Sequence, residues 1–400
     1  MRESVSRWRA ALIVFVVALA ACTVSPSPTP EPTADHTFVF GVILVGPRDD
    51  RGWSEAHYNG GRYVEAHLSG SRMLYLDNLN PDARPNTTLA EAVNDMVAEG
   101  ARLLFITSDD FAADTTFVAE KHPDVVFIHI SGDHVLQGNA PANVGNYMAR
   151  MEFGKMIAGC SAALITESGA IGYLGPLIND ETRRLANSAF LGARYCYEQF
   201  RDQSPNELQF LVEWIGFWFH IPGVTADPAA VSNELFDQGA DVILSGIDTT
   251  EAITVAEERA AKGEHVWAVP YDYEGACNGV PNVCLGVPYF NWGPGYLEIA
   301  RQVLDGAWAP RWDWVGPDWS DINNPDTSPV GYVDGPALND AQMAQLHTFI
   351  DGLADGSITL FQGPLHYQDG SRFLSQGEIA GDTQIWFMPQ LLEGMEGASE

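Results

Sequence analysis

Apolar and polar positions follow one another along this chain in blocks that predict buried strands and amphipathic helices. Residues 38–45 form a short apolar run rich in β-branched side chains, which is typical of a buried strand in a parallel sheet. Residues 46–52 contain glycine, proline and charged side chains, and they predict a loop. From Trp53 to residue 68 the apolar positions recur with helical spacing. The chain therefore begins, after its N-terminal segment, with the first half of a βαβ unit.

The same succession of strand and helix recurs and predicts two α/β lobes. In the first series, strands and helices are expected at residues 73–76, 87–99, 102–107, 113–122 and 125–131. A second series is expected at residues 153–164, 169–175, 182–197, 208–214, 228–238, 241–245, 249–262 and 266–271. Further helices are predicted at residues 293–306 and 340–353, and they flank a tryptophan-rich stretch, 308–319. We expect these tryptophans to pack against the lobes.

Candidate binding residues follow the predicted strands directly. In parallel α/β sheets, ligands bind beyond the carboxyl ends of the strands. Asp50 and Trp53 occupy the first of these loops, where a large aromatic side chain is not needed for packing. Asp109, Asp248 and Asp272 occupy later ones, and their carboxylates can accept hydrogen bonds from amines or ring N–H groups. Capping of the following helix is the alternative role for these three residues.

Length and charge narrow the class of protein. The 400 residues favour two domains, and the formal net charge of −32 argues against nucleic acid and against a highly anionic ligand. We expect a protein that is not an enzyme, because the chain has neither a Gly-x-Ser-x-Gly nor a His-Glu-x-x-His motif. Cysteine and histidine spacings predict no metal site, and no cofactor is expected.

The N-terminus resembles a bacterial lipoprotein signal. Basic residues precede an apolar stretch, and small residues then precede Cys22. We expect residues 1–21 to be removed, Cys22 to be lipidated, and the proline-rich residues 22–37 to act as a tether. The protein would then be exported and anchored to the outer face of the cytoplasmic membrane. A plain signal peptide and a membrane anchor are the alternatives.

Four further cysteines form an even set, which suggests disulfides in an exported chain. Cys277 and Cys284 flank a turn-rich segment, so we expect a local bridge between them. Cys160 and Cys196 lie in predicted helices and either pair with each other or stay as buried thiols.

Several motifs, taken in order, carry a family resemblance. They are Asp-Arg-Gly-Trp-Ser at 50–54, His-Ile-Ser-Gly at 129–132, Asn-Val-Gly-Asn-Tyr at 143–147, Gln-Gly-Ala-Asp-Val-Ile at 238–243, Pro-Tyr-Phe-Asn-Trp-Gly-Pro at 288–294 and Ile-Thr-Leu-Phe-Gln-Gly-Pro at 358–364. With them the chain resembles the basic membrane lipoprotein family, the substrate-binding proteins of ABC importers that include purine-nucleoside receptors.

This resemblance implies a type 1 periplasmic-binding-protein fold. Two Rossmann-like lobes would be joined by three crossovers that form a hinge, with the ligand in the central cleft. The N-terminal lobe is expected at residues 38–145 plus about 288–335. The C-terminal lobe is expected at residues 146–287 plus about 336–400.

The resemblance also implies roles for individual residues. The stacking aromatic of the family maps to Trp53 and its polar neighbour to Ser54, and the aromatic of the second lobe maps to Trp218. Acidic ligand-binding residues map to Asp109 and Asp272.

Two positions depart from the nucleoside receptors of the family. Those receptors carry an aspartate where this chain has Leu44 or Val45, and a lysine where it has the segment containing Asn291 and Trp292. We keep Asn291 and Trp292 as candidate ligand contacts. Both departures weaken ribose recognition and favour a free base such as adenine.

Together these features predict a monomeric, extracytoplasmic solute-binding lipoprotein that delivers a purine base or nucleoside to an ABC permease. A ligand sensor that signals to a membrane partner is the alternative from another class. A hydrolase on the same fold is the third candidate.

Overall fold

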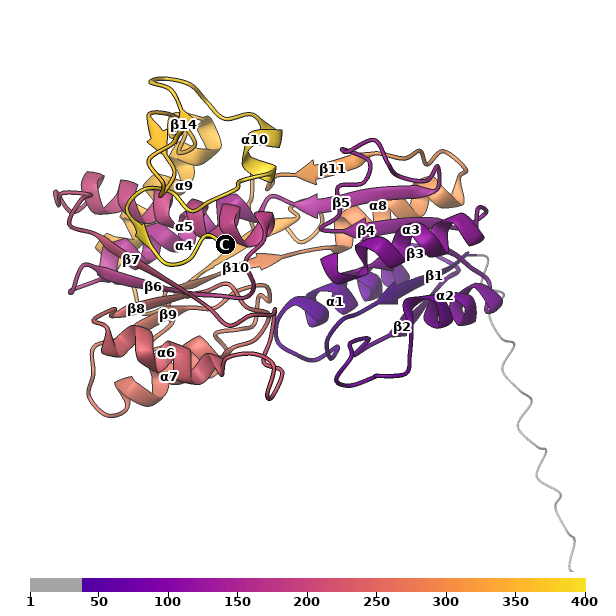
Figure 1. The fold of residues 1–400 in the computed structure, drawn as a ribbon, viewed down its shortest axis with the longest axis horizontal. Coiled ribbons are helices and arrows are strands. Elements are labelled where there is room, and N and C mark those ends of the chain that lie inside the picture. The colour runs from indigo at the N-terminus through magenta and orange to yellow at the C-terminus, as the bar shows by residue number, and fades with distance from the viewer. Residues whose placement is uncertain (1–37) are drawn as a thin grey trace, which may run out of the picture. The chain divides into compact units, whose positions relative to one another are not determined.

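The computed structural model of the protein describes residues 38–400 (Figure 1). The predicted signal peptide, Cys22 and the tether lie outside the described residues. Among the helices of residues 38–400, none combines the length and the apolar character that crossing a membrane requires.

The first lobe is built on a six-stranded parallel sheet with the strand order β11-β5-β4-β3-β1-β2. Its strands are β1 (Phe38–Ile43), β2 (Ser71–Leu76), β3 (Ala101–Ile106), β4 (Val126–Ile130), β5 (Val144–Ala149) and β11 (Trp312–Val315). β1 is buried at every position, as its continuous apolar sequence predicts. A strand with helices on both faces has no side that needs polar residues.

Four helices and one short turn belong to the first lobe. They are α1 (Trp53–His67), α2 (Leu89–Ala98), the 3₁₀ turn η1 (Asp109–Phe111), α3 (Ala112–Lys121) and α8 (Gly293–Leu304). α1 packs against α8, whereas α2 packs against α3. The start of α2 is fixed by a capping box. The Thr88 hydroxyl accepts from the Glu91 backbone amide, and the Glu91 carboxylate accepts from the Thr88 backbone amide.

The second lobe contains a five-stranded parallel sheet with the order β15-β7-β6-β8-β9. Its strands are β6 (Ala170–Gly175), β7 (Gln209–Trp214), β8 (Val242–Ser245), β9 (Trp267–Val269) and β15 (Met395–Glu396). Its helices are α4 (Met151–Ile165), α5 (Asp180–Gln199), α6 (Pro228–Asp237), α7 (Glu251–Ala260) and α9 (Asp340–Asp355). The structure thus has the two parallel α/β lobes that the sequence pattern predicted.

Three connections link the lobes. The chain passes from β5 into α4, returns through β10 (Gly286–Phe290) into α8, and crosses again through β12 (Val330–Asp334) into α9. β10 and β12 pair in antiparallel fashion and form a small separate sheet. These three crossings are compatible with a hinge, and we propose lobe boundaries close to those that the sequence suggested, with the first of them after β5 rather than within it.

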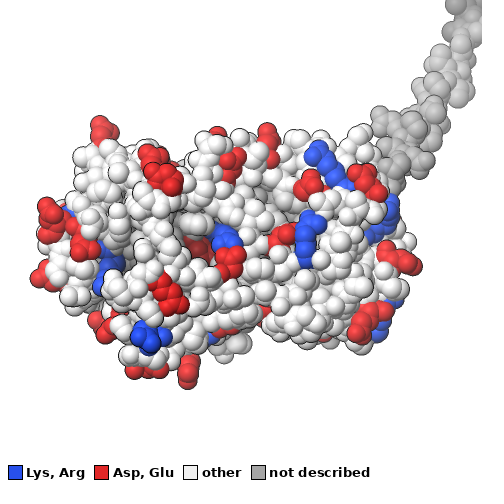
Figure 2. Space-filling view, turned by 90° about the horizontal axis from the view of Figure 1, so that it is seen from above, with Lys and Arg blue, Asp and Glu red and all other residues white. Residues whose placement is uncertain are grey.

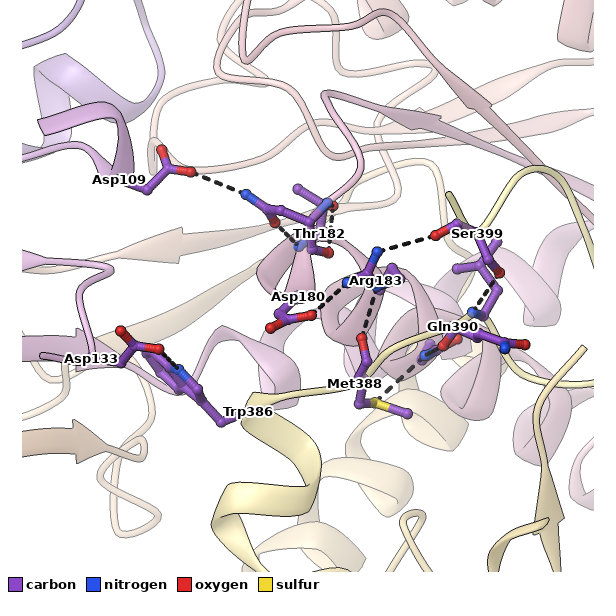
Figure 3. A network of polar contacts seen from close by, with 12 residues as sticks. Asp109, Asp133, Asp180, Thr182, Arg183, Trp386, Met388, Gln390 and Ser399 are labelled. Atoms are coloured by element: carbon purple, nitrogen blue, oxygen red, sulfur yellow. Dashed lines mark hydrogen bonds and ion pairs between the residues drawn. The ribbon is translucent and has the colours of Figure 1, made fainter. Parts of the chain in front are cut away.

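The C-terminal segment after α9 contains β13 (Leu365–His366), β14 (Arg372–Leu374) and α10 (Asp382–Trp386) before β15. It packs mainly on the second lobe, but Trp386 joins the core of the first lobe. The Trp386 indole N–H donates to Asp133 at 3.3 Å (Figure 3). The segment therefore does not belong wholly to the second lobe, which differs from the expectation.

Three tryptophans of the 308–319 stretch pack against other aromatic rings, in agreement with the expected packing role. Trp312 and Trp314 of β11 contact Trp386 edge-on, with ring centroids 5.0 and 5.3 Å apart. Trp319 packs edge-on against Phe153 at 5.1 Å.

Two disulfides are present in the structure. Cys160 of α4 is joined to Cys196 of α5, with Cα atoms 5.2 Å apart. Cys277 is joined to Cys284 across the turn, with Cα atoms 6.0 Å apart. The first bridge ties together two helices that form the centre of the second lobe.

Candidate functional site

A narrow, nearly closed cavity lies where the two sheets bring their carboxyl ends together. Its walls come from both lobes, and its lining residues are Val45, Trp53, Ser108, Asp109, Ser131, Glu181, Trp218 and Asp248. The first five follow β1, β3 and β4, and the last three follow β6, β7 and β8. This is the edge at which parallel α/β sheets bind ligands.

Trp53 is held rigidly by its own lobe. Its indole N–H donates to the Thr107 carbonyl at 2.7 Å, and its ring meets those of His57, Phe290 and Trp292 edge-on. Only 7% of Trp53 is exposed, and the residue belongs to the core of the first lobe. The predicted site residue is therefore a core residue as well, with one part of the ring facing the cavity.

Trp218 forms the opposite part of the wall and lies in the loop after β7. It belongs to none of the apolar core clusters of residues 38–400. Its carbonyl accepts from the Asp248 amide at 2.9 Å within the second lobe. Its indole N–H donates across the cavity to Asp109 Oδ1, also at 2.9 Å.

Asp109 joins the two lobes at the cavity. Besides the bond from Trp218, its Oδ2 accepts from the side-chain amide of Asn179 at 3.0 Å (Figure 3). Asn179 in turn caps α5 by accepting from the Thr182 amide, so the contact reaches a fixed helix end. Burial raises the pKa of Asp109, while the hydrogen bond from Trp218 opposes that rise.

The loop before α1 also touches the second lobe. A Cβ atom on Gly52 would lie 1.6 Å from the Asp248 carbonyl oxygen, so this position has no room for a side chain. The Arg51 guanidinium donates to the Asn278 carbonyl at 3.1 Å. These contacts and those of Asp109 hold the lobes together around the cavity.

The remaining polar wall is acidic. Burial raises the pKa of Glu181 to about 7, although Arg184 lies 3.6 Å away. Asp248 is 4% exposed, and burial together with nearby Asp272 and Asp50 raises its pKa well above the usual value. α7 begins after Thr250 without a side-chain cap, so Asp248 does not cap that helix. None of the lining residues is Lys or Arg.

Asp272 lies deeper, after β9, and does not line the cavity. It is fully buried, has a φ angle of 72°, and neither carboxyl oxygen has a hydrogen-bond partner. Burial raises the pKa of Asp272 well above its usual value, and the nearby Lys155 ammonium of α4 opposes this rise. Burial also lowers the pKa of Lys155 to about 7. The Lys155 ammonium donates to the Ser245 carbonyl at 2.6 Å.

Four predicted residues support the site from outside the cavity wall. Asp50 accepts from the amides of Gly52, Ser54 and Glu55, and it thereby caps the start of α1. Burial raises the pKa of Asp50 to about 6. The Ser54 hydroxyl accepts from the Gly46 amide, which fixes the loop after β1.

The other two lie farther back. Trp292 is completely buried behind Trp53 and stacks on His57 with centroids 4.3 Å apart. The Asn291 side chain donates to two backbone carbonyls of the loop before β12. Neither side chain lines the cavity, because Trp292 packs into the core of the first lobe and Asn291 bonds to the loop before β12.

Sequence reasoning missed Ser108, Ser131 and Glu181. All three follow strands that had been predicted, so a search of every loop at the carboxyl edge would have found them. Ser131 also lies within the His-Ile-Ser-Gly motif at 129–132, which was a second signal.

Comparison with protein families agrees with this geometry. Residues 38–310 match the family described as ABC transporter substrate-binding protein, PnrA-like. The chain belongs to this family. It is accordingly an extracytoplasmic substrate-binding protein, whose partners are a small-molecule ligand and an ABC permease.

Two curated relatives cover almost the whole of this binding protein. A purine-binding protein of Brucella abortus is 29% identical over 366 residues, which make up 91% of this chain and 94% of the relative. A putative ABC transporter glucose-binding protein of Haloferax volcanii is 26% identical over 92% of this chain and 82% of its own length.

Solved structures support the fold. A solute-binding protein of an ABC transporter system from Aeropyrum pernix superposes with a TM-score of 0.61. The match covers 82% of this chain and 93% of the other, with 14% sequence identity. At this identity the likeness concerns the fold alone, and it agrees with the expected type 1 periplasmic-binding-protein architecture.

Proposed function

We propose that this PnrA-like protein binds a purine base, adenine in preference, between Trp53 and Trp218. The observation that supports the proposal is the pairing of two indoles, one from each lobe, at a cavity whose ionisable lining residues are all carboxyls. A flat heteroaromatic ring between such walls gains about 1–3 kcal/mol for each stacked face. Its edges then meet acceptors rather than cations.

Carboxyl groups suit the donors of an aminopurine. The exocyclic amine and a ring N–H of adenine can donate to Asp109, Asp248 or Glu181, which face the cavity. An anionic ligand such as a nucleotide would meet three carboxyls without a basic partner in the wall. The proposal therefore favours a neutral, donor-rich ring. Asp272, with two unpartnered oxygens behind the wall, is kept as a further contact for a larger ligand such as a nucleoside.

The two curated relatives define the main competing ligand. The relative from Brucella abortus is named for purine binding, and that from Haloferax volcanii for glucose. A sugar would also use aromatic faces and carboxylate acceptors. It differs from a purine in having no π face that could occupy the space between two indoles.

Titration calorimetry on the mature protein separates these ligands. We expect adenine to bind tightest, adenosine and guanine more weakly, and glucose not at all at millimolar concentration. Each tight ligand should also raise the melting temperature by linkage. Binding of glucose without any response to purines would refute the proposal.

We further propose that the protein is a monomer whose Cys22 carries the lipid anchor, so that ligand is captured at the outer face of the cytoplasmic membrane. Cell fractionation of wild type and Cys22→Ala tests the anchor. The variant should leave the membrane fraction, and its full retention there would contradict lipidation at Cys22.

A further inference from the structure

A second cavity lies between α4, β11 and the C-terminal segment, and it shares no lining residue with the first. About 680 Å³ within it is not filled by atoms, and most of its wall is apolar. Characteristic residues of this wall are Phe153, Met156, Trp314, Leu360, Phe361 and Ile385. The enclosed part amounts to about 210 Å³, and a mostly apolar cavity with a few polar groups is the usual character of a small-molecule site.

One charged group of this wall has an open hydrogen-bonding site. Glu152, which lies in the first turn of α4, is only 5% exposed. Its Oε1 accepts from Arg184 Nε at 2.7 Å, whereas its Oε2 has no partner. A buried acceptor that stays unpaired costs about 1–3 kcal/mol, so a donor that enters this cavity is favoured there.

Two arginines lie near Glu152: Arg150 lines the cavity and Arg184 lies behind the Glu152 carboxyl, and each contacts at least one carboxyl. Arg184 lies between Glu152 and Glu181, so one guanidinium serves two carboxyls. The Arg150 guanidinium lies over the Trp314 ring at 4.2 Å and donates to Asp382 at 2.5 Å. The charged residues of the wall itself are Arg150 and Glu152. Arg150 is paired with Asp382, whereas Glu152 keeps one oxygen open, so a cationic donor suits this wall better than an anion.

We propose that this cavity is a second ligand site, which binds a small amphiphile through an apolar chain or ring and an ammonium group that donates to Glu152 Oε2. The apolar part contacts the aromatic and aliphatic wall, and the ammonium donates to the open Oε2 of Glu152. Fatty anions are excluded by the same carboxyl. The proposal concerns a site distinct from the purine cavity and does not depend on the ligand of that cavity.

Three probes of equal chain length test the chemistry. Octylamine, octanol and octanoate are titrated by calorimetry into the mature protein in the absence of any purine. We expect octylamine to bind at least tenfold tighter than octanoate, with octanol between them. Equal binding of octylamine and octanoate would overturn the proposal, and so would the failure of all three to bind at millimolar concentration.

Two variants locate the binding. Ala380→Trp places an indole on the cavity wall and should reduce octylamine affinity at least tenfold. Ala261→Trp, on an exposed position of the second lobe, is its matched control and should leave the affinity within twofold. Unchanged octylamine binding in Ala380→Trp would place the amine elsewhere and refute the site.

The carboxyl is tested separately. Glu152→Gln should remove most of the preference for octylamine over octanol, while exposed Glu198→Gln on α5 should keep it. Melting curves of each variant report whether it folds. If Glu152→Gln does not fold, the ratio of the three probes in wild type together with Ala380→Trp still decides the outcome.

Discussion

The two indoles of the purine cavity are held in different ways. Trp53 begins a 15-residue helix, bonds to a carbonyl of its own lobe and packs into an aromatic cluster. Trp218 lies in an irregular loop outside the core clusters, and its ring nitrogen bonds to the opposite lobe. Trp53 is therefore set in place when its lobe folds. Trp218 gains its full set of contacts only when the lobes meet.

This difference suggests that the two lobes of a hinged binding protein have different roles in forming the site. A rigid surface on one lobe presents a prebuilt half of the site, which limits the ordering that binding requires. A loop on the other lobe completes the site on closure, and the energy of its contacts then favours the closed state. Asp109 takes part in both the prebuilt half of the site and the closure, because it lies on the first lobe and accepts hydrogen bonds from two donors of the second lobe.

The largest expected effect is that of Trp53→Ala. Removing a buried indole from an aromatic core should lower the free energy of unfolding by about 3–5 kcal/mol, and it should also abolish measurable purine binding. Denaturant unfolding and calorimetry measure the two effects. A near-native stability would show that the first lobe does not need this ring, and the contrast between the indoles would then be wrong.

Trp218→Ala should behave in the opposite way. We expect purine affinity to fall by about 1–3 kcal/mol, the contribution of one stacked face. The loss of stability without ligand should be smaller than in Trp53→Ala, because Trp218, although only 8% exposed, belongs to no apolar core cluster of residues 38–400. The control is Phe217→Ala in the same loop, which should change affinity less, because Phe217 does not line the cavity. Collapse of the ligand-free protein would make Trp218 a core residue.

Glu181 lines the cavity from helix α5 of the second lobe, whereas Trp218 lines it from a loop of the same lobe. Its pKa is raised from 4.5 to about 7, so the folded state binds the proton more tightly than the unfolded chain. This group therefore lowers stability as the pH rises from about 4.5 to 7, and the penalty is complete above that range. Relative to wild type, the free energy of unfolding of Glu181→Gln should therefore rise by about 2–3 kcal/mol between pH 5 and pH 8.

Melting curves of wild type and Glu181→Gln at the two pH values measure that gain. Glu198→Gln, at an exposed position on the same helix, should follow wild type at both. An equal effect of both substitutions would mean that burial of Glu181 does not control its proton.

Asp109→Asn should have the smallest effect. One acceptor oxygen becomes a donor facing the N–H groups of Trp218 and Asn179, so the closed state should lose about 1 kcal/mol. Purine affinity should fall severalfold with no change in the stability of either lobe. The adjacent, exposed Asp110→Asn is the matched control, and an equal loss there would remove the special role of Asp109.

The sequence was informative about elements and about the edge of the sheet where the site lies. Continuous apolar runs predicted β1 and β4 as buried parallel strands, the loops after strands contained Asp109 and Asp248, and Trp53 directly follows the first of these loops. These predictions succeed because periodicity and turn chemistry act over a few residues. Trp218 was found through the family resemblance, since an aromatic in a loop has no local pattern of its own.

The direction of a side chain behind the wall was not predictable. Trp292 and Asn291 were expected to contact ligand, yet one packs behind Trp53 and the other holds a loop. Asp50 was expected at the ligand and instead caps α1. In each case the residue lies next to the site in sequence, and a contact with another element decides which way it turns.

The charged residues also show the difference between what the sequence determines and what the tertiary structure determines. The sequence by itself determined a strongly acidic protein with net charge −32, and on the face shown in Figure 2 acidic groups are spread widely while Lys and Arg occur in small separate groups. Only the tertiary structure decided that Glu181, Asp248 and Asp109 meet at one cavity and that Glu152 and Glu181 share Arg184. These residues are up to 139 positions apart in the chain, from Asp109 to Asp248. Local propensity fixes helices and strands, whereas burial and long-range pairing fix which charges become neighbours and how their protons respond.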